Sequence, residues 1–301
     1  MKQVLLGLFA MLCICSVTSQ TIRLATYRYA TNDRIANISP LGQQLEKSLG
    51  SSVSVKSYNT VHEFIDAIRN NEVDIALINT FGFLLLEASD KSFPMLPRLA
   101  LEVKADAKDN YKTVIAARAN VPVTTLSDLP ARAGTMRMHF VAEGSTSGNL
   151  VPRLALSGAG INNPEKSFRK WGYSGNHAAA IELLLKDSTD IAAMGHTEYE
   201  KLQADPARAK QLKQIWLSPE IPLGPVLLNK RLSPIQQQQI VDCFLTLEQT
   251  NEPALSAVKA GWSEAKQATH YISINADFYT PFKSTLGSPV YLQEILRRFA
   301  N

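Results

Sequence analysis

Apolar and polar positions follow two different periods along this chain. The runs TIRLATY (21–27) and SVSVKSY (52–58) alternate between apolar and polar residues, as strands do. VHEFIDAIRNNE (61–72) repeats its apolar positions at helical spacing, and VDIALIN (73–79) is a nearly continuous apolar run. Because such runs suit strands that are buried on both faces, the pattern predicts an α/β fold with mainly parallel sheets flanked by helices.

A helix is predicted between the first two strands, over SPLGQQLEKSLG (39–50). Ser39 is a candidate N-cap, and Pro40 falls in the first turn, where its missing N–H leaves no intrahelical bond unmade. Gly50 is a candidate C-cap. We therefore expect the helix to begin at Ser39 and to end before Gly50.

Two segments far apart in the chain resemble each other. HEFIDAIRNNEVDIALINT (62–80) and HAAAIELLLKDSTDIAAMGHT (177–197) each give a helix, a polar turn, Asp-Ile-Ala at the start of a strand, and a polar exit that ends in Thr. The likeness is too loose and too widely spaced for a solenoid, but it indicates two α/β lobes of similar build. Asp74 and Asp190 are then turn and strand-start residues and not catalytic carboxylates.

Two segments punctuated by proline are interpreted as chain crossings between the lobes. They are YKTVIAARANVPVTTLSDLPAR (111–132) and KQIWLSPEIPLGPVLLNKRLSP (213–234). The final helices, including SPVYLQEILRRFAN (288–301), are expected to pack back on the first lobe. The predicted division gives residues 20–108 and 230–301 to the first lobe and residues 109–229 to the second.

The first nineteen residues have the pattern of a secretory signal peptide. Lys2 supplies the positive start, residues 4–17 are apolar but too few for a membrane span, and a small-residue cleavage pattern ends at Ser19. We expect residues 1–19 to be removed, so that a monomeric mature chain begins at Gln20 in the periplasm. The alternatives are a buried first helix and a lipoprotein acylated at Cys15, which the large preceding residue disfavours.

Composition excludes several classes of function. With 45% hydrophobic and 19% charged residues and a net charge of +4, the chain is ordinary for a globular protein and gives no electrostatic case for nucleic acid. Cys243 is the one cysteine beyond the leader, so an internal disulfide is excluded, and its helical context predicts a buried thiol. No metal or other cofactor is expected, because the five histidines lack ligand spacing: His62, His139, His177, His196 and His270.

The densest hydroxyl cluster lies where a strand is predicted to pass into a helix. Ser145, Thr146 and Ser147 stand between MRMHFVAEG (136–144) and NLVPRLALSG (149–158). At a helix N-terminus the first backbone N–H groups lack partners and the dipole is positive, so this position suits a compact anion. The simpler alternative is N-capping, for which one hydroxyl suffices.

An enzymatic interpretation of the same cluster is weaker. GSTSG (144–148) resembles the nucleophile elbow Gly-x-Ser-x-Gly, but its central residue is Thr146. His177 and Glu198 would be the partners of a triad, yet in hydrolases of that type the acid precedes the histidine. A serine hydrolase remains a remote alternative.

A longer segment carries a family resemblance. STSGNLVPRLALSGAGINNPEKSFRKWGYSGNHAAAI (145–181) resembles the signature region of phosphonate, phosphite and phosphate ABC-transporter substrate-binding proteins, with Ser-Thr-Ser-Gly, Leu-Val-Pro and Tyr-Ser-Gly-x-His in the same order. The resemblance extends over most of the mature chain. It implies a two-lobed type II periplasmic binding fold that closes over a small tetrahedral oxyanion in the cleft between its lobes, without catalysis. The implied partner is an ABC permease, and the alternative is a sensor kinase.

The resemblance also implies the site. Three of its residues have simpler structural explanations. His177 could be a cap or core residue, and Tyr111 could pack at the hinge. Glu198 matches an acid that faces the amine in aminophosphonate binders, but it could also be exposed helix surface. The residues that match ligand-binding positions of the family are Ser145, Thr146, Ser147, His177, Tyr111 and Glu198.

Three positions depart from the family pattern. Val61 stands where aminophosphonate binders carry a tyrosine, Ala178 replaces a frequent acidic residue, and Gly224 replaces a second amine-facing aspartate. An ammonium group is costly to bury without a carboxylate. We therefore expect 2-aminoethylphosphonate to bind less tightly than phosphite, methylphosphonate or phosphate.

Overall fold

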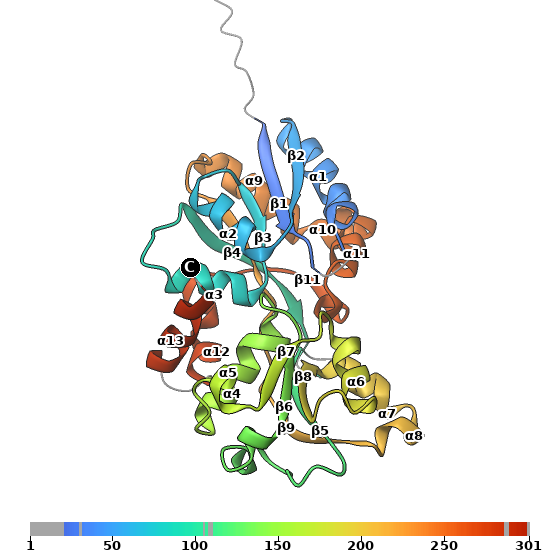
Figure 1. Ribbon diagram of the computed structural model, residues 1–301. Coiled ribbons are helices and arrows are strands. Elements are labelled where there is room, and N and C mark those ends of the chain that lie inside the picture. Colours follow the sequence, from blue (N-terminus) through green and yellow to red (C-terminus); the bar gives the residue numbers. More distant parts are fainter. Residues whose placement is uncertain (1–20, 30–31, 105, 108–110, 286–288, 300–301) are drawn as a thin grey trace, which may run out of the picture.

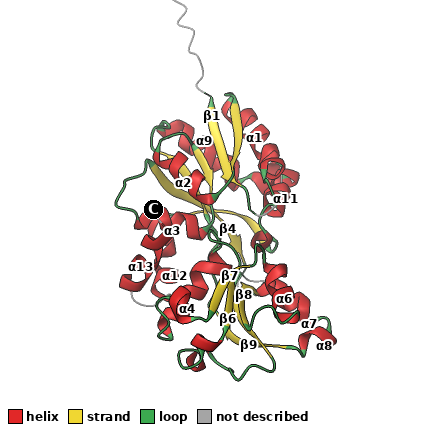
Figure 2. Cartoon of the chain, viewed as in Figure 1, coloured by secondary structure: helices red, strands yellow, loops and turns green. Residues whose placement is uncertain are grey.

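Two mixed β-sheets, each flanked by helices, form two lobes that lie one beyond the other along the molecule (Figure 1). This computed structural model describes residues 21–29, 32–104, 106–107, 111–285 and 289–299. Figure 2 shows helices on both sides of each sheet. The α/β class and the two lobes that the sequence predicts are confirmed.

The first lobe holds a six-stranded sheet in the order β11-β4-β10-β3-β1-β2. One apolar core lies between this sheet and helices α2 and α3, and a second lies between the sheet and helices α1, α9, α10 and α11. The strands are β1 Ile22–Tyr27, β2 Val53–Tyr58, β3 Ile75–Leu77, β4 Met95–Val103, β10 Pro225–Asn229 and β11 Ala268–Ser273; the helices are α1 Ile35–Leu49, α2 Val61–Arg69, α3 Thr80–Ala88, α9 Pro234–Leu245, α10 Leu247–Thr250 and α11 Glu252–Ala260.

The second lobe holds a five-stranded sheet in the order β7-β6-β8-β5-β9. Its two cores lie on opposite faces, one beside α4 and the other beside α6 and α7. The strands are β5 Thr113–Arg118, β6 Arg137–Phe140, β7 Lys170–Tyr173, β8 Ile191–Gly195 and β9 Leu212–Leu217; the helices are α4 Val151–Gly158, α5 Pro164–Ser167, α6 His177–Leu185, α7 His196–Gln203 and α8 Pro206–Ala209.

Both sheets are mixed rather than mainly parallel. β1 pairs in parallel with β2 and β3, and β6 pairs in parallel with β7 and β8. The pairs that involve β4, β5, β9, β10 and β11 are antiparallel. Parallel neighbours need a crossover connection, usually a helix, whereas β5 and β10 enter their sheets directly from the other lobe. The apolar run of a strand does not reveal its direction.

The two crossings run side by side between the lobes. The first joins β4 to β5 and the second joins β9 to β10, and the backbone N–H of Ile221 donates to the carbonyl of Tyr111 at 2.7 Å. The expected boundary at residues 108 and 109 lies outside the described residues. The expected return at residue 230 is later than the structure has it, because β10 pairs with β3 and β4 of the first sheet.

The internal likeness has a structural counterpart in two buried carboxylates. Asp74 Oδ2 accepts from the backbone N–H and Nε of Arg23, at the start of β1, at 2.9 and 3.0 Å. Asp190 Oδ2 accepts from the same two groups of Arg137, at the start of β6, at 2.8 and 3.0 Å. Each aspartate therefore ties the strand that follows it to the neighbouring parallel strand, which is a structural role.

Helix α1 begins earlier than predicted. It starts at Ile35, so Ser39 and Pro40 lie inside it, and the hydroxyl of Ser39 donates to the carbonyl of Ile35 at 2.7 Å. The predicted N-cap is thus wrong, because the buried face at Ile38 extends the helix toward its N-terminus. Gly50 ends the helix as predicted, in the left-handed conformation that suits glycine.

The last two helices, α12 (Thr280–Thr285) and α13 (Pro289–Phe299), pack on more than the first lobe. Side chains of α13 share one core with α3 of the first lobe and with α4 of the second. His62 Nε2 contacts the carbonyl of Phe299 at 3.1 Å, and Arg298 donates to the carbonyl of Asn162 at 2.9 Å. Helix α13 therefore bridges the lobes on one side of the molecule (Figure 1).

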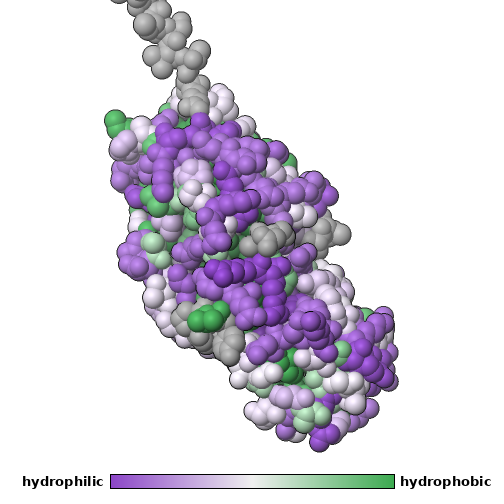
Figure 3. Space-filling view, turned by 60° about the vertical axis from the view of Figure 1, so that its left-hand side comes forward, coloured by the Kyte–Doolittle hydropathy of each residue, from purple (hydrophilic) through white to green (hydrophobic). Residues whose placement is uncertain are grey.

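The predicted signal peptide lies outside the described residues. Within the described ranges, no helix combines the length and the apolar character needed to cross a membrane. Cys243 is buried on α9, as the sequence predicts. The face drawn in Figure 3 is mainly hydrophilic, and its apolar residues are scattered over both lobes.

Candidate ligand-binding site

The hydroxyl triplet lies buried at the start of the helix that follows β6. Ser145, Thr146 and Ser147 are each at most 3% exposed. A π-helical turn over Thr146–Leu150 leads into α4, and the Ser145 hydroxyl accepts from the N–H of Gly148 at 3.0 Å. The sequence left capping and anion binding as alternatives, and the structure makes the Ser145 hydroxyl the cap of this helical turn, which the hydroxyls of Thr146 and Ser147 do not cap.

The triplet also lies against the first lobe. The N–H of Phe81, in the first turn of α3, donates to Thr146 Oγ1 at 3.1 Å. The side-chain amide of Asn79 donates to the carbonyl of Gly144 at 2.9 Å. A Cβ atom built on Gly144 would lie 2.5 Å from Cγ1 of Val61, so the lobes are in close contact beside the triplet.

His177, the first residue of α6, is brought next to the triplet. Its Nδ1 accepts from the N–H of Gly195 at 2.9 Å, which places the proton of the neutral ring on Nε2. Burial lowers the pKa of His177 to about 4, although the charge of Glu198 acts in the opposite direction. At neutral pH the ring is therefore an uncharged donor through Nε2.

Tyr29 is a site residue that the sequence prediction missed. Its hydroxyl lies 3.2 Å from Nε2 of His177 in the other lobe. Burial raises the pKa of Tyr29, so it remains a protonated phenol. Tyr29 follows the carboxyl end of β1, and ligands bind at the carboxyl ends of strands in open α/β sheets. This position could have identified Tyr29 from the sequence.

Tyr111 lies where the chain passes between the lobes. It lies at the first crossing, where its carbonyl accepts from Ile221, and its ring packs against the cores of the first lobe. Burial raises the pKa of Tyr111, although interactions with the side chains of Ser147 and Thr146 act in the opposite direction. Tyr111 therefore lies at the crossing between the lobes, with the triplet in its surroundings.

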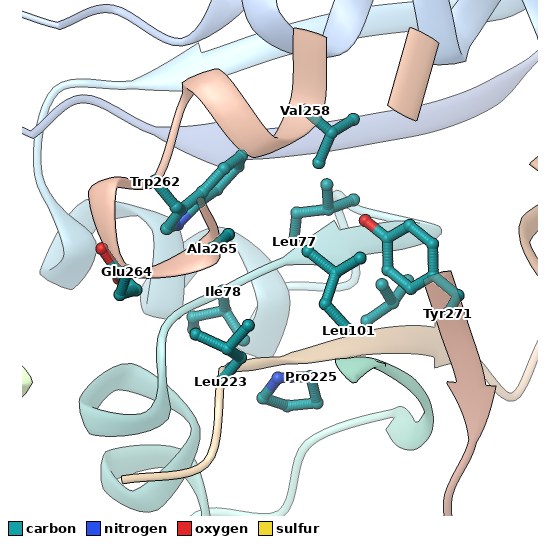
Figure 4. Close-up of a pocket in the computed structure, with 12 residues that line it drawn as sticks. Leu77, Ile78, Leu101, Leu223, Pro225, Val258, Trp262, Glu264, Ala265 and Tyr271 are labelled. Carbon is teal, nitrogen blue, oxygen red and sulfur yellow. The ribbon is translucent and has the colours of Figure 1, made fainter. Parts of the chain in front are cut away.

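Glu198 is not joined to the triplet. Its carboxylate accepts from Nζ of Lys201 at 2.5 Å, in the same helix, and its side chain is 25% exposed. Glu264, which the sequence prediction did not consider, lies beside Trp262 at the edge of a small apolar cavity (Figure 4). Its charge adds to burial in raising the pKa values of Tyr29 and Tyr111.

Gly224 lines the same cavity as Glu264 and has no room for a side chain. A Cβ atom on Gly224 would lie 1.9 Å from the carbonyl oxygen of Ile78. The cavity measures about 30 Å³ and is lined by side chains such as Leu223 and Trp262.

The site is thus a set of uncharged donors between two lobes. The hydroxyls of Tyr29, Tyr111 and the triplet suit a small oxyanion in a place shielded from water, and Nε2–H of His177 orients the Tyr29 hydroxyl. The described residues contain no group of three or more side chains that could hold a metal ion. His177 is bonded to Gly195 and Tyr29 and not to a serine, so no hydrolase triad is assembled.

Comparison with known proteins decides the family. Residues 27–272 match the family described as "ABC transporter, phosphonate, periplasmic substrate-binding protein". The chain belongs to this family. Its members are periplasmic binding proteins and not enzymes, so the family resemblance of the sequence is confirmed.

Among its relatives is the phosphonates-binding periplasmic protein of Escherichia coli strain K12, which is 29% identical over 225 residues, 74% of this chain and 65% of the relative. PhnD1 of Prochlorococcus marinus strain MIT 9301, named a probable ABC transporter phosphite binding protein, is 28% identical over 41% of this chain and 43% of its own length. This chain thus spans less than two thirds of both relatives.

Solved structures give the fold. A binding protein component of an ABC phosphonate transporter from Pseudomonas aeruginosa has a TM-score of 0.66 at 20% identity, over 93% of this chain and 88% of that one. PhnD1 in complex with methylphosphonate has a TM-score of 0.62 at 18% identity, over 88% and 96%. The type II periplasmic binding fold expected from the sequence is confirmed.

Proposed function

We propose that this protein captures a small tetrahedral oxyanion, namely a phosphonate, phosphite or phosphate, and delivers it to an ABC permease. The observation that carries the proposal is the buried triplet Ser145–Ser147, surrounded by protonated, uncharged donors from both lobes. Closing the lobes around an anion removes water and strengthens each of these hydrogen bonds. No bond in the ligand is broken.

The ligand head is proposed to contact the triplet, Tyr111 and His177. The remaining candidate, Glu198, would lie at the edge of the ligand site, because its carboxylate already accepts from Lys201. Gly224 offers no carboxylate and Val61 is apolar, so neither can pair with an amine at the end of a ligand's tail. We therefore propose that phosphite, methylphosphonate and phosphate bind more tightly than 2-aminoethylphosphonate.

A thermal-shift panel on the mature protein tests this proposal. A ligand at a hundred times its dissociation constant adds about 2.7 kcal/mol to the free energy of unfolding. We expect a clear rise in Tm with at least one of the three small anions and a smaller rise with 2-aminoethylphosphonate. The reverse order would contradict the proposed preference, and Glu198→Gln and Glu264→Gln would then show which carboxylate binds the amine.

The proposed partner follows from the family and is tested by genetics. Permease and ATPase genes beside this gene, together with loss of uptake of the bound anion when they are deleted, are expected. Kinase and regulator genes in their place would favour a sensory role. Export is tested by intact mass of the periplasmic protein, which is expected to begin at Gln20; an acylated Cys15 would contradict it.

A further inference from the structure

Arg34 is a buried cation whose bonds go to the backbone. It is 4% exposed, and its Nε donates to the carbonyl of Gly261 at 2.8 Å. In the part of the chain that the structure describes, no aspartate or glutamate forms an ion pair with Arg34. A buried charge without a counter-ion is costly, so the surroundings of the guanidinium must stabilise it in another way.

Three aromatic rings supply that stabilisation. The guanidinium carbon lies 4.4 Å from the ring centroid of Trp262, 4.8 Å from that of Tyr27 and 5.4 Å from that of Tyr29. These are distances at which a cation is attracted to the face of a ring. The Arg34 side chain therefore joins the helical segment around Trp262 to the ring of Tyr29.

Hydrogen bonds also hold the backbone of Tyr29 in place. Tyr29 and Asn32 exchange two backbone hydrogen bonds, at 3.0 and 2.9 Å, and the Asn32 side chain accepts from the N–H of Arg34 at 3.0 Å. Arg34 itself has a positive φ of 48°, a conformation that side-chain-bearing residues seldom adopt. Arg34 keeps this strained backbone conformation at the point where its side chain enters the cluster of three rings.

The far end of Tyr29 reaches the other lobe. Since the neutral His177 ring carries its proton on Nε2, the Tyr29 oxygen accepts from His177 and its own O–H can donate elsewhere. His177 itself lies beside the triplet, since a Cβ atom on Gly195 would meet both the His177 ring at 3.6 Å and Ser147 Oγ at 3.7 Å. An oxyanion held at the triplet is the acceptor that this orientation suits.

We propose that Tyr29 is the first lobe's own ligand-binding hydroxyl, and that Arg34 is the residue that positions it. The inference rests on the proposed function, because the acceptor is the same tetrahedral oxyanion. It adds that the first lobe contributes a donor from the end of β1, so that the oxyanion is bound only when both lobes meet around it.

Isothermal titration calorimetry with methylphosphonate and with phosphite tests the role of Tyr29. Tyr29→Phe removes a hydroxyl that donates to a buried anion and should weaken binding about ten- to a hundredfold. Tyr58→Phe is the matched control, because Tyr58 ends the neighbouring strand β2 and its hydroxyl faces Glu72 at 3.5 Å. It should change affinity less than about threefold, within the usual range for a change away from the site.

A double-mutant cycle tests the role of Arg34. Arg34→Met should weaken binding about tenfold in the wild-type background and hardly at all in the Tyr29→Phe background, because positioning acts only through the hydroxyl that is positioned. Arg34→Lys, which keeps the cation over the rings, should restore part of the affinity. Arg28→Gln is the control for charge, since Arg28 is exposed and pairs with Asp33.

Three outcomes overturn the inference. Unchanged affinity in Tyr29→Phe would remove Tyr29 from the site while leaving the proposed function in place. An equal loss from Arg34→Met in both backgrounds would mean that Arg34 acts on the anion by its charge and does not position Tyr29. If the wild type binds none of methylphosphonate, phosphite and phosphate, the proposed function fails and the inference fails with it.

Discussion

The Tyr29 hydroxyl of the first lobe lies 3.2 Å from Nε2 of His177 in the second lobe. The other ring nitrogen of His177 accepts from the N–H of Gly195, so the ring has no free position for a second proton. Protonation of Nδ1 would therefore break the bond from Gly195, which lies within the second lobe, while Nε2–H could still donate to Tyr29. Because the second lobe needs a neutral His177, we expect the fold to be sensitive to acid.

Stability should fall as the pH drops from about 6.5 to about 4. The pKa of His177 lies at about 4 in the folded protein against an ordinary 6.5, so the unfolded chain binds more protons in this interval and acid favours unfolding. Above pH 6.5 the effect is absent. We expect Tm of His177→Asn to fall less than that of the wild type over the same interval. The same dependence of Tm on pH in both proteins would contradict the assignment of this effect to His177. His270→Asn, at the surface, is the control.

Two substitutions in the triplet should separate capping from binding. Ser147→Ala should reduce affinity for the oxyanion about ten- to a hundredfold without lowering Tm of the free protein. Ser145→Ala should reduce affinity as well and should also cost about 1 kcal/mol in the free energy of unfolding, because it removes the cap on Gly148. Calorimetry and urea denaturation measure the two effects. Unchanged affinity in both variants would leave the triplet as a cap alone.

Asp74→Asn should destabilise the fold by roughly 3 kcal/mol, because it leaves Arg23 and Arg231 beside a buried neutral amide. Although burial alone would raise it, hydrogen bonds from Arg231 and Arg23 hold the pKa of Asp74 below its ordinary 3.8. Its stabilising effect is thus present above pH 3.8 and is lost as the pH falls further. Urea denaturation should show a change of less than 0.5 kcal/mol or so for the exposed control Asp66→Asn.

Gly224→Asp should not create an amine-binding site. The new side chain would begin 1.9 Å from the carbonyl of Ile78, so the second crossing would have to move, at a cost of about 3 kcal/mol or more. Gly158→Ala, where a Cβ meets nothing within 4 Å, is the control and should leave Tm almost unchanged. A stable Gly224→Asp variant that gained affinity for 2-aminoethylphosphonate would contradict this account.

Local sequence patterns predicted the elements best where local chemistry fixes them. Gly50 ends α1, and Ser145 starts the helical turn after β6, because a left-handed residue and a capping hydroxyl act within a few residues of themselves. The start of α1 was mispredicted, because burial of its face in the core outweighs the capping preference of Ser39. The direction of β10 and the reach of α13 across both lobes were also missed, since both depend on partners distant in sequence.

The sequence by itself determined the α/β class, the two lobes and the position of the hydroxyl triplet at a helix start. These follow from periodicity, capping and the order of short motifs, all of which act over a few residues. Only the tertiary structure decided that Tyr29 meets His177, that Glu198 is not joined to the triplet, and that no side chain fits at Gly224. The physical reason is that each of these depends on which atoms the folded backbone brings within a few ångströms of one another, and residues such as Tyr29 and His177, almost half the chain apart, meet only when the lobes do.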